Sequence, residues 1–150
     1  MPDSPSFAPS SDPQPAAMRL PPHSLEAEQA VLGGLLLDNN AWDRIADVIG
    51  DSDLYRQDHR HILKAIVRQI AESKPADAVT VAEALQSLGE LEAIGGLAYL
   101  VALANNTPSA ANIRRYAEIV RERAVLRKLA EVATGIADSA YSPAGKPASQ

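Results

Sequence analysis

NIRRYAEIVRERAVLRKLAEVATGIADSA, residues 112–140 of the chain, runs for 29 residues without a proline and with a single glycine, Gly135. Such a run predicts one continuous α-helix of about 44 Å, since an α-helix rises about 1.5 Å per residue. An average globular helix is about a third as long. We therefore expect the rest of the chain to be organised around this helix.

The apolar residues of the predicted helix follow two lines instead of one. The first line occupies one face of its N-terminal half and consists of Ile113, Tyr116, Ala117, Val120 and Ala124. The second line is spaced three and four residues apart from Leu126 onward and consists of Ile119, Leu126, Leu129, Ala133, Ile136 and Ala140. Alternating spacings of three and four are typical of a coiled-coil seam. The first line is expected to pack on the preceding residues and the second to need another helix, because the residues after Tyr141, SPAGKPASQ, predict only a loop.

The composition is that of one compact domain without disulfides. Hydrophobic residues make up 46% of the 150 residues and aromatic residues only 4%, so aliphatic side chains must fill the core. The absence of cysteine excludes disulfides and thiolate metal sites. The sequence shows neither an apolar run long enough to span a membrane nor a signal peptide, and a cytoplasmic location is expected.

Charge is distributed unevenly along the chain. Residues 1–112 carry a net charge of −8 and residues 113–150 a net charge of +3. Six of the fourteen basic residues fall within fifteen positions of the predicted long helix: Arg114, Arg115, Arg121, Arg123, Arg127 and Lys128. Glutamates three or four residues away can pair with several of them on a solvated helix surface. The alternatives are an acidic partner protein or a nucleic-acid backbone, although few aromatic residues are available for base stacking.

The sequence divides the whole chain into four predicted segments. Residues 1–22 hold seven of the eleven prolines and predict a disordered arm, residues 23–111 a helical globular subdomain, residues 112–141 the long helix and residues 142–150 a loop or the start of a linker. Ser24 is expected to cap the first helix, and the Gly33-Gly34 pair indicates a closely packed neighbouring backbone. Further helices are predicted over residues 41–49 after an Asn40 cap, 58–72, from a Thr80–Glu83 capping box to Leu88, and 97–104.

The sequence contains no pattern that predicts catalysis or a resident cofactor. His59 and His61 would point about 200° apart on a helix and so could not share a metal ion. The pair of helices around Gly95-Gly96 has the spacing of a helix-turn-helix, but residues 75–113 contain no Lys or Arg to contact phosphates. No catalytic, cofactor-binding or metal-binding residue is predicted.

Four runs, in the same order, resemble the N-terminal domain of the bacterial replicative DNA helicase DnaB. They are PPHSLEAEQAVLGG at residues 21–34, DHRHI at 58–62, GGLAYL at 95–100, and NTPSAANI at 106–113 leading to IVRERA at 119–124. The resemblance covers about residues 20–145. It implies an all-α fold: a globule of about five short helices followed by one long helix, the first arm of a helical hairpin.

The resemblance also implies a role in DNA replication. In the family such domains pair through their hairpins and form a collar on a hexameric ring that encircles single-stranded DNA, and the collar docks primase and possibly a helicase loader. The sequence shows neither a second hairpin arm nor the RecA-like ATPase domain, so ATP, Mg and unwinding would belong to the longer protein, and this chain is not expected to be an enzyme.

Two sets of residues on the long helix are the predicted sites. The apolar seam, Ile119, Leu126, Leu129, Ala133 and Ile136, is expected to face a second arm or a second subunit. The basic patch, Arg121, Arg123, Arg127 and Lys128, is expected to face neighbouring subunits or primase. A helical DNA-binding regulator and a generic protein-interaction adaptor are the alternative functions, and a stand-alone enzyme is the least favoured.

Overall fold

The computed structural model describes residues 19–142, and all regular secondary structure in this range is helical. The α-helices are α1 (Leu25–Leu37), α2 (Trp42–Ile45), α3 (Gln57–Ala71), α4 (Ala78–Ser87), α5 (Gly96–Asn105) and α6 (Ile113–Tyr141). Short 3-10 turns lie at η2 (Asn39–Ala41), η3 (Asp51–Asp53) and η4 (Glu92–Ile94). The predictions for residues 1–18 and 143–150 lie outside the described residues.

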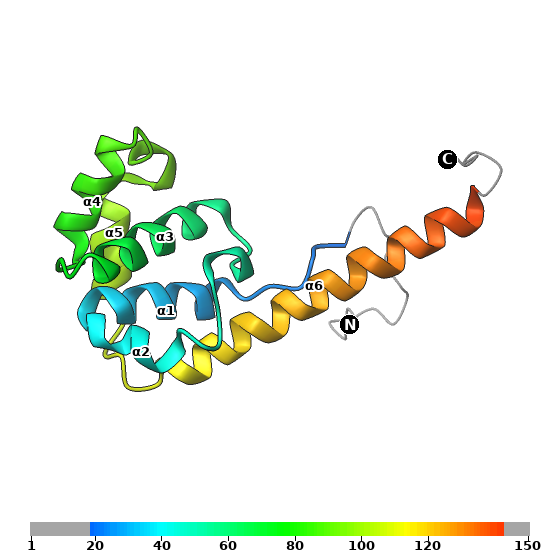
Figure 1. The fold of residues 1–150 in the computed structure, drawn as a ribbon, viewed down its shortest axis with the longest axis horizontal. Helices are drawn as coiled ribbons and strands as arrows, with labels where there is room; N and C mark the ends of the chain where they lie inside the picture. The colour runs from blue at the N-terminus through cyan, green and yellow to red at the C-terminus, as the bar shows by residue number, and fades with distance from the viewer. Residues whose placement is uncertain (1–18, 143–150) are drawn as a thin grey trace, which may run out of the picture.

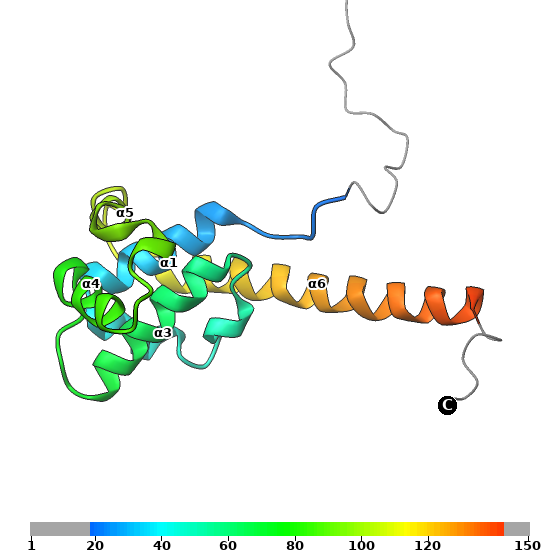
Figure 2. The ribbon, with the colours of Figure 1, turned by 90° about the horizontal axis from the view of Figure 1, so that it is seen from above.

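Helix α1 is the centre of a globule formed by the first five α-helices. It contacts α3, α5 and the first part of α6, while α4 packs against α3 and α5 (Figures 1 and 2). The core is aliphatic, as the composition predicts, and its largest fully buried apolar side chains are Leu32, Leu35, Ile45, Leu54, Ile62, Leu63, Ile66, Leu85, Ile94, Leu100 and Ile113.

The glycine pair of α1 lies where α1 meets other parts of the chain. A Cβ on Gly33 would overlap the backbone oxygen of Leu103 and the side chain of Thr107, and one on Gly34 would lie 3.1 Å from Ile113 Cδ1. The expected close approach of a neighbouring backbone is therefore confirmed at Gly33. This contact joins α1 to the end of α5.

The first helix begins as predicted, because the Ser24 side chain accepts a hydrogen bond from the Ala27 amide at 3.2 Å. The predicted cap of the second helix was wrong. The Asp38 carboxylate accepts from the Asn40 amide at 3.0 Å and caps the 3-10 turn η2. The N-cap of α2 is Ala41, which makes no side-chain capping hydrogen bond, and α2 spans only Trp42–Ile45 of the predicted 41–49.

The predicted start of α4 was also wrong. Asp77 is its N-cap: the Asp77 carboxylate accepts from the Thr80 amide at 2.9 Å, and the Thr80 hydroxyl accepts from the Asp77 amide at 2.9 Å. This reciprocal pair places the N-cap at Asp77, three residues before Thr80, the N-cap of the predicted Thr80–Glu83 box.

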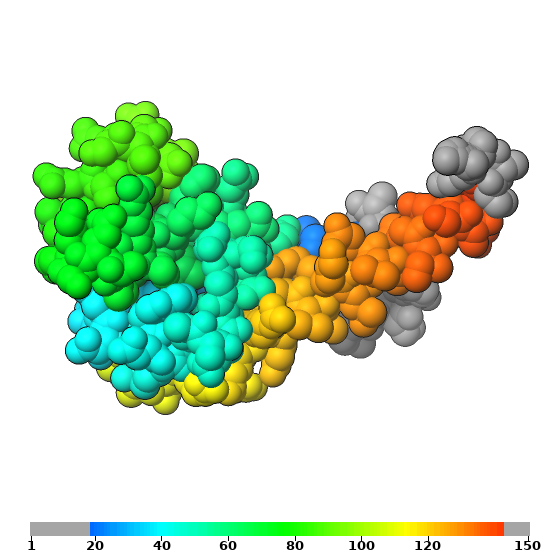
Figure 3. Space-filling view, viewed as in Figure 1, coloured from blue at the N-terminus to red at the C-terminus, as the bar shows by residue number. Residues whose placement is uncertain are grey.

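Helix α6 extends from the globule as a single rod, which confirms the predicted all-α fold of a globule and one long helix (Figure 3). Its first half packs on the globule through Ile113, Ala117 and Val120, which are buried. From Lys128 to Tyr141 every residue is exposed. The chain thus has a packed core at one end and an uncovered helix at the other.

Candidate functional site

The apolar seam lies largely on the uncovered part of α6. The exposed fractions of Leu126, Leu129 and Ile136 are 46%, 62% and 67%, and Ala133 is exposed as well. Ile119 differs from the other four, because it is partly buried and packs against the core of the globule. Four of the five predicted seam residues are therefore free to contact another helix.

The exposed seam faces away from the side of α6 that packs on the globule. Leu129 follows the buried Val120 by nine residues, and Leu126 follows the buried Ala117 by the same number. At about 100° per residue, nine residues correspond to about half a turn around the helix axis. Most of the seam therefore lies on the side of α6 opposite its own globule, and Leu129 also lines a groove beside the η3 turn.

Two further apolar side chains widen the seam. Val125 and Val132 are 49% and 47% exposed and lie seven residues apart on α6. The heptad line through Leu126 and Leu129 did not include them. Both line a groove where α6 leaves the globule, together with Ser52 and Asp53 of the η3 turn.

The four residues of the basic patch have different surroundings. The Arg121 guanidinium donates to Asp53 Oδ1 at 2.8 Å, and Arg127 donates to two backbone carbonyls of the same chain. Arg123 Nη1 lies 3.9 Å from Glu122 Oε1, and Lys128 Nζ lies 3.4 Å from Glu131 Oε1. Arg121 and Arg127 thus connect α6 to its own globule, whereas Arg123 and Lys128 form ion pairs within α6. A contact of any of them with a partner stays a prediction.

A buried polar cluster, formed by Glu28, His59 and Tyr99, was not predicted from the sequence. Glu28 and His59 are 1% and 0% exposed; His59 Nδ1 lies 2.7 Å from Glu28 Oε1, and His59 Nε2 lies 2.6 Å from the Tyr99 hydroxyl. Glu28 Oε2 also accepts from the Tyr55 amide at 2.5 Å. One feature of the sequence does indicate that Glu28 is buried. Glu28 precedes Val31 by three residues, and this spacing places it on the inner face of α1.

An ion pair borders this cluster at the start of α3. Arg56 donates to both carboxylate oxygens of Asp58, at 2.9 and 2.6 Å. Burial acts to raise the pKa of Asp58, but the hydrogen bonds from Arg56, the positive charges nearby and the hydrogen bond from the His59 amide together lower it. Asp58 is therefore ionised over a wider pH range than an exposed aspartate.

The described residues contain no group of three His, Asp or Glu side chains that could hold a metal ion. His61 lies apart from His59, and its Nδ1 is 3.3 Å from Glu90 Oε1 at the surface. Over residues 19–142, none of the helices has the length and apolar character needed to span a membrane. Among the described residues, the seam is the apolar surface of α6 that its own globule leaves exposed.

Comparison with known proteins finds similarity to one kind of protein, the replicative DNA helicases. The family model described as "DnaB-like helicase N terminal domain" matches residues 20–122. The replicative DNA helicase DnaB of Haemophilus influenzae is 47% identical over 137 residues, which are 91% of this chain and 29% of that protein. DnaB of Geobacillus stearothermophilus is 44% identical over 83% of this chain and 27% of its own length. The chain thus spans less than a third of the length of these relatives.

Solved structures show the same fold. The crystal structure of the N-terminal domain of DnaB helicase from Mycobacterium tuberculosis matches with a TM-score of 0.80 and 42% identity, over 82% of this chain and 85% of that one. The N-terminal domain of DnaB helicase from Helicobacter pylori, a structure that describes its interactions with primase, matches with a TM-score of 0.64 and 23% identity, over 77% of this chain and 89% of that one. The second likeness concerns the fold alone.

Proposed function

The chain belongs to the family of DnaB-like helicase N-terminal domains, and from this premise we propose that it is the collar domain of a replicative DNA helicase. In this role it pairs with a second copy of itself, as part of a hexamer formed from three such pairs, and docks primase. It works in the cytoplasm during DNA replication and primosome assembly.

The observation that carries this proposal is the exposed apolar seam. Leu126, Leu129 and Ile136 are large aliphatic side chains, and each is close to half exposed or more on a helix that extends beyond its own globule. Exposed apolar surface of this kind marks a site of protein association. The three-and-four spacing fits a partner helix that packs side by side with α6.

The contact with primase is the second part of the proposal. The M. tuberculosis and H. influenzae relatives support the family, and the H. pylori structure describes a primase interaction for its own protein. Here the side chains of Arg123 and Lys128 are 38% and 74% exposed and form ion pairs with glutamates of α6 itself. We assign to the basic patch salt-dependent contacts with neighbouring subunits or primase.

The activity of the whole helicase is assigned to other parts of such a protein. ATP and Mg would act in a RecA-like ATPase domain, and single-stranded DNA would pass through the assembled ring instead of binding this domain alone. A helicase loader is a further partner of the ring. The residues described here supply the assembly surface.

Light scattering across a concentration series tests the pairing. We expect the chain to form a dimer or a larger species. A charge in the seam, Leu129→Asp, should weaken pairing by at least about 100-fold, because losing about 3 kcal/mol of apolar contact corresponds to that factor.

The matched control is Val79→Asp, which places the same charge at a 59% exposed valine of α4, away from the seam. This variant should pair like the parent chain. Pairing that is unchanged by Leu129→Asp, or lost equally in both variants, would contradict the proposal.

A further inference from the structure

Arg127 makes three contacts with its own chain at the point where α6 leaves the globule. Its guanidinium donates from Nη1 to the carbonyl oxygen of Pro22 at 2.8 Å and from Nη2 to that of Asp53 at 2.6 Å. Its Cζ also lies 5.4 Å from the centroid of the Tyr55 ring. A planar guanidinium can donate in two directions and lie over an aromatic ring at once, which a lysine ammonium cannot do.

Asp53 and Tyr55, which contact Arg127, are themselves fixed by hydrogen bonds and ring stacking. Asp53 Oδ2 accepts from the Gly50 amide at 2.9 Å, which fixes the η3 turn, and the Tyr55 amide donates to the buried Glu28 at 2.5 Å. The His23 ring stacks on the Tyr55 ring with centroids 4.2 Å apart. Arg127 is therefore connected through Tyr55 and Glu28 to the buried cluster in the globule.

Arg127 lies where the exposed half of α6 begins, so a small change in helix direction there moves the exposed end. Arg127 is the last residue of α6 that is partly buried, and the following 14 residues, 128–141, are all exposed. These residues extend about 21 Å at the usual helical rise. A tilt of about 10° at Arg127 would move the end of α6 by about 4 Å, which is large beside the 8–10 Å between the axes of packed helices.

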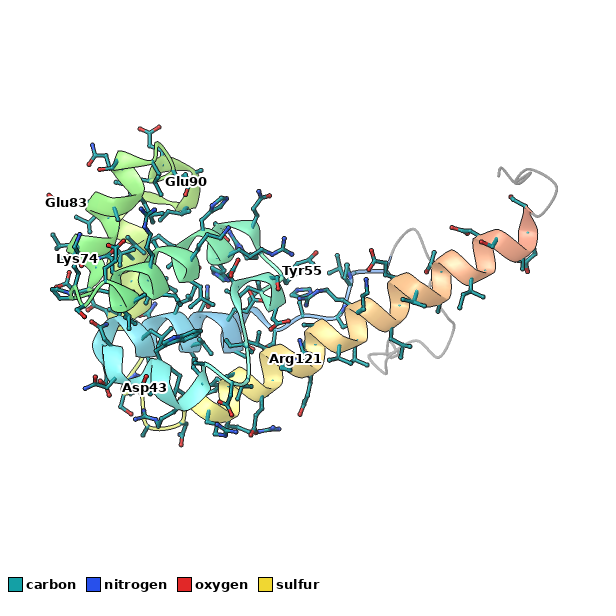
Figure 4. The ribbon with its side chains drawn as sticks, in the orientation of Figure 1. Asp43, Tyr55, Lys74, Glu83, Glu90 and Arg121 are labelled. Carbon is teal, nitrogen blue, oxygen red and sulfur yellow. The ribbon has the colours of Figure 1, made fainter. Side chains whose placement is uncertain are left out.

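We infer that Arg127 is a positioning residue that sets the direction of the exposed half of α6 relative to the globule. Figure 4 shows Tyr55 and Arg121 at the place where α6 leaves the globule, and Arg121 adds a second bond to Asp53 there. The consequence for assembly rests on the proposed function: a fixed direction presents the seam to a second copy at one angle. The direction itself does not depend on pairing.

Distances between two spin labels within one chain test this inference. The chain has no cysteine, so Lys64→Cys on α3 and Ser139→Cys near the end of α6 provide unique exposed sites. Dilution of the labelled chain with unlabelled chain leaves only distances within a chain. Arg127→Gln should shift and broaden the distance distribution, while Arg123→Gln, which alters an arginine paired only within α6, should leave it unchanged.

Two more variants separate the contacts of Arg127. Arg127→Lys keeps the charge but loses one carbonyl bond, and Tyr55→Leu removes the ring; each should broaden the distribution less than Arg127→Gln. A distribution for Arg127→Gln that overlays the parent's, or full recovery in Arg127→Lys, would overturn the inference. Light scattering on the same variants reports pairing separately, so a chain that stays monomeric would contradict the proposed function and leave the distance result valid.

Discussion

At the scale of single residues, the two glycines Gly33 and Gly135 have opposite surroundings although both lie inside α-helices. A Cβ on Gly33 would overlap Leu103 and Thr107, whereas one on Gly135 meets nothing within 4 Å. Gly33 therefore permits the close packing of α1 against the end of α5. Gly135 has no such role in the described residues and only lowers the helical stability of α6.

The substitution of each glycine by alanine should accordingly change stability in opposite directions. Gly33→Ala should lower the free energy of unfolding by at least about 1 kcal/mol, because the overlap costs more than the gain in helix propensity. Gly135→Ala should raise it by about 0.5–1 kcal/mol. Urea unfolding at one fixed protein concentration measures both. A Gly33→Ala chain as stable as the parent would show that the contact can relax.

The structural role of a residue could be predicted where the pattern that indicates it lies within one segment of the sequence. Ser24 and Gly33 were predicted because the signals, a capping residue type and a glycine pair, lie within one segment, although the backbone that approaches Gly33 comes from the end of α5. The Glu28, His59 and Tyr99 cluster joins side chains 31 and 40 residues apart, from three different helices. No spacing within one segment contains that information, and only the fold brings these groups together.

At the scale of helices, the start of α4 shows how two capping patterns compete. Thr80 and Glu83 fit the usual capping box, but Thr80 instead donates its amide to Asp77 and accepts from the Asp77 amide. The aspartate at N-cap satisfies the amide three residues later equally well. The helix therefore starts earlier than the better-known pattern predicts. The residues just before the cap are also bonded to other elements, since the Pro75 carbonyl accepts from Gln69 of α3 and the Ala76 amide donates to Asn39 of the η2 turn.

The basic patch of α6 leads to a prediction at the same scale. Reversing two charges with Arg123→Glu and Lys128→Glu should weaken binding of the helicase-binding domain of the cognate primase mainly at low salt, because screening shortens the range of surface charges. Binding titrations at low and high salt measure this. The control is Lys64→Glu, which makes the same change on α3, where the side chain is 70% exposed. Equal affinity of all variants at low salt would count against the patch.

At the scale of the whole molecule, the hydrophobic core and the exposed seam lie in different parts of the structure. The globule carries the core and fixes the start of α6 through buried Ile113, Ala117 and Val120, while the far half of α6 carries the seam. The all-α fold with a long helix was predictable because periodicity and length are properties of the sequence itself. The separation of the globule-facing line from the seam was predictable too, because helical spacing fixes it, whereas the bonds of Arg121 and Arg127 to Asp53 join residues far apart in the sequence and were not predicted.

The central claim is that the seam is covered by a second copy of the chain, and the protection of single thiols tests it most directly. Ala133→Cys places a thiol in the seam, and Thr134→Cys places one on the adjacent residue, which is also exposed and lies about 100° around the helix. Because the chain has no cysteine of its own, each thiol reports one position.

The measurement is the rate at which a thiol reagent labels each variant as protein concentration rises. We predict that labelling slows with concentration for Ala133→Cys and stays constant for Thr134→Cys, because pairing covers only the seam. Equal rates for the two variants at every concentration would contradict the account.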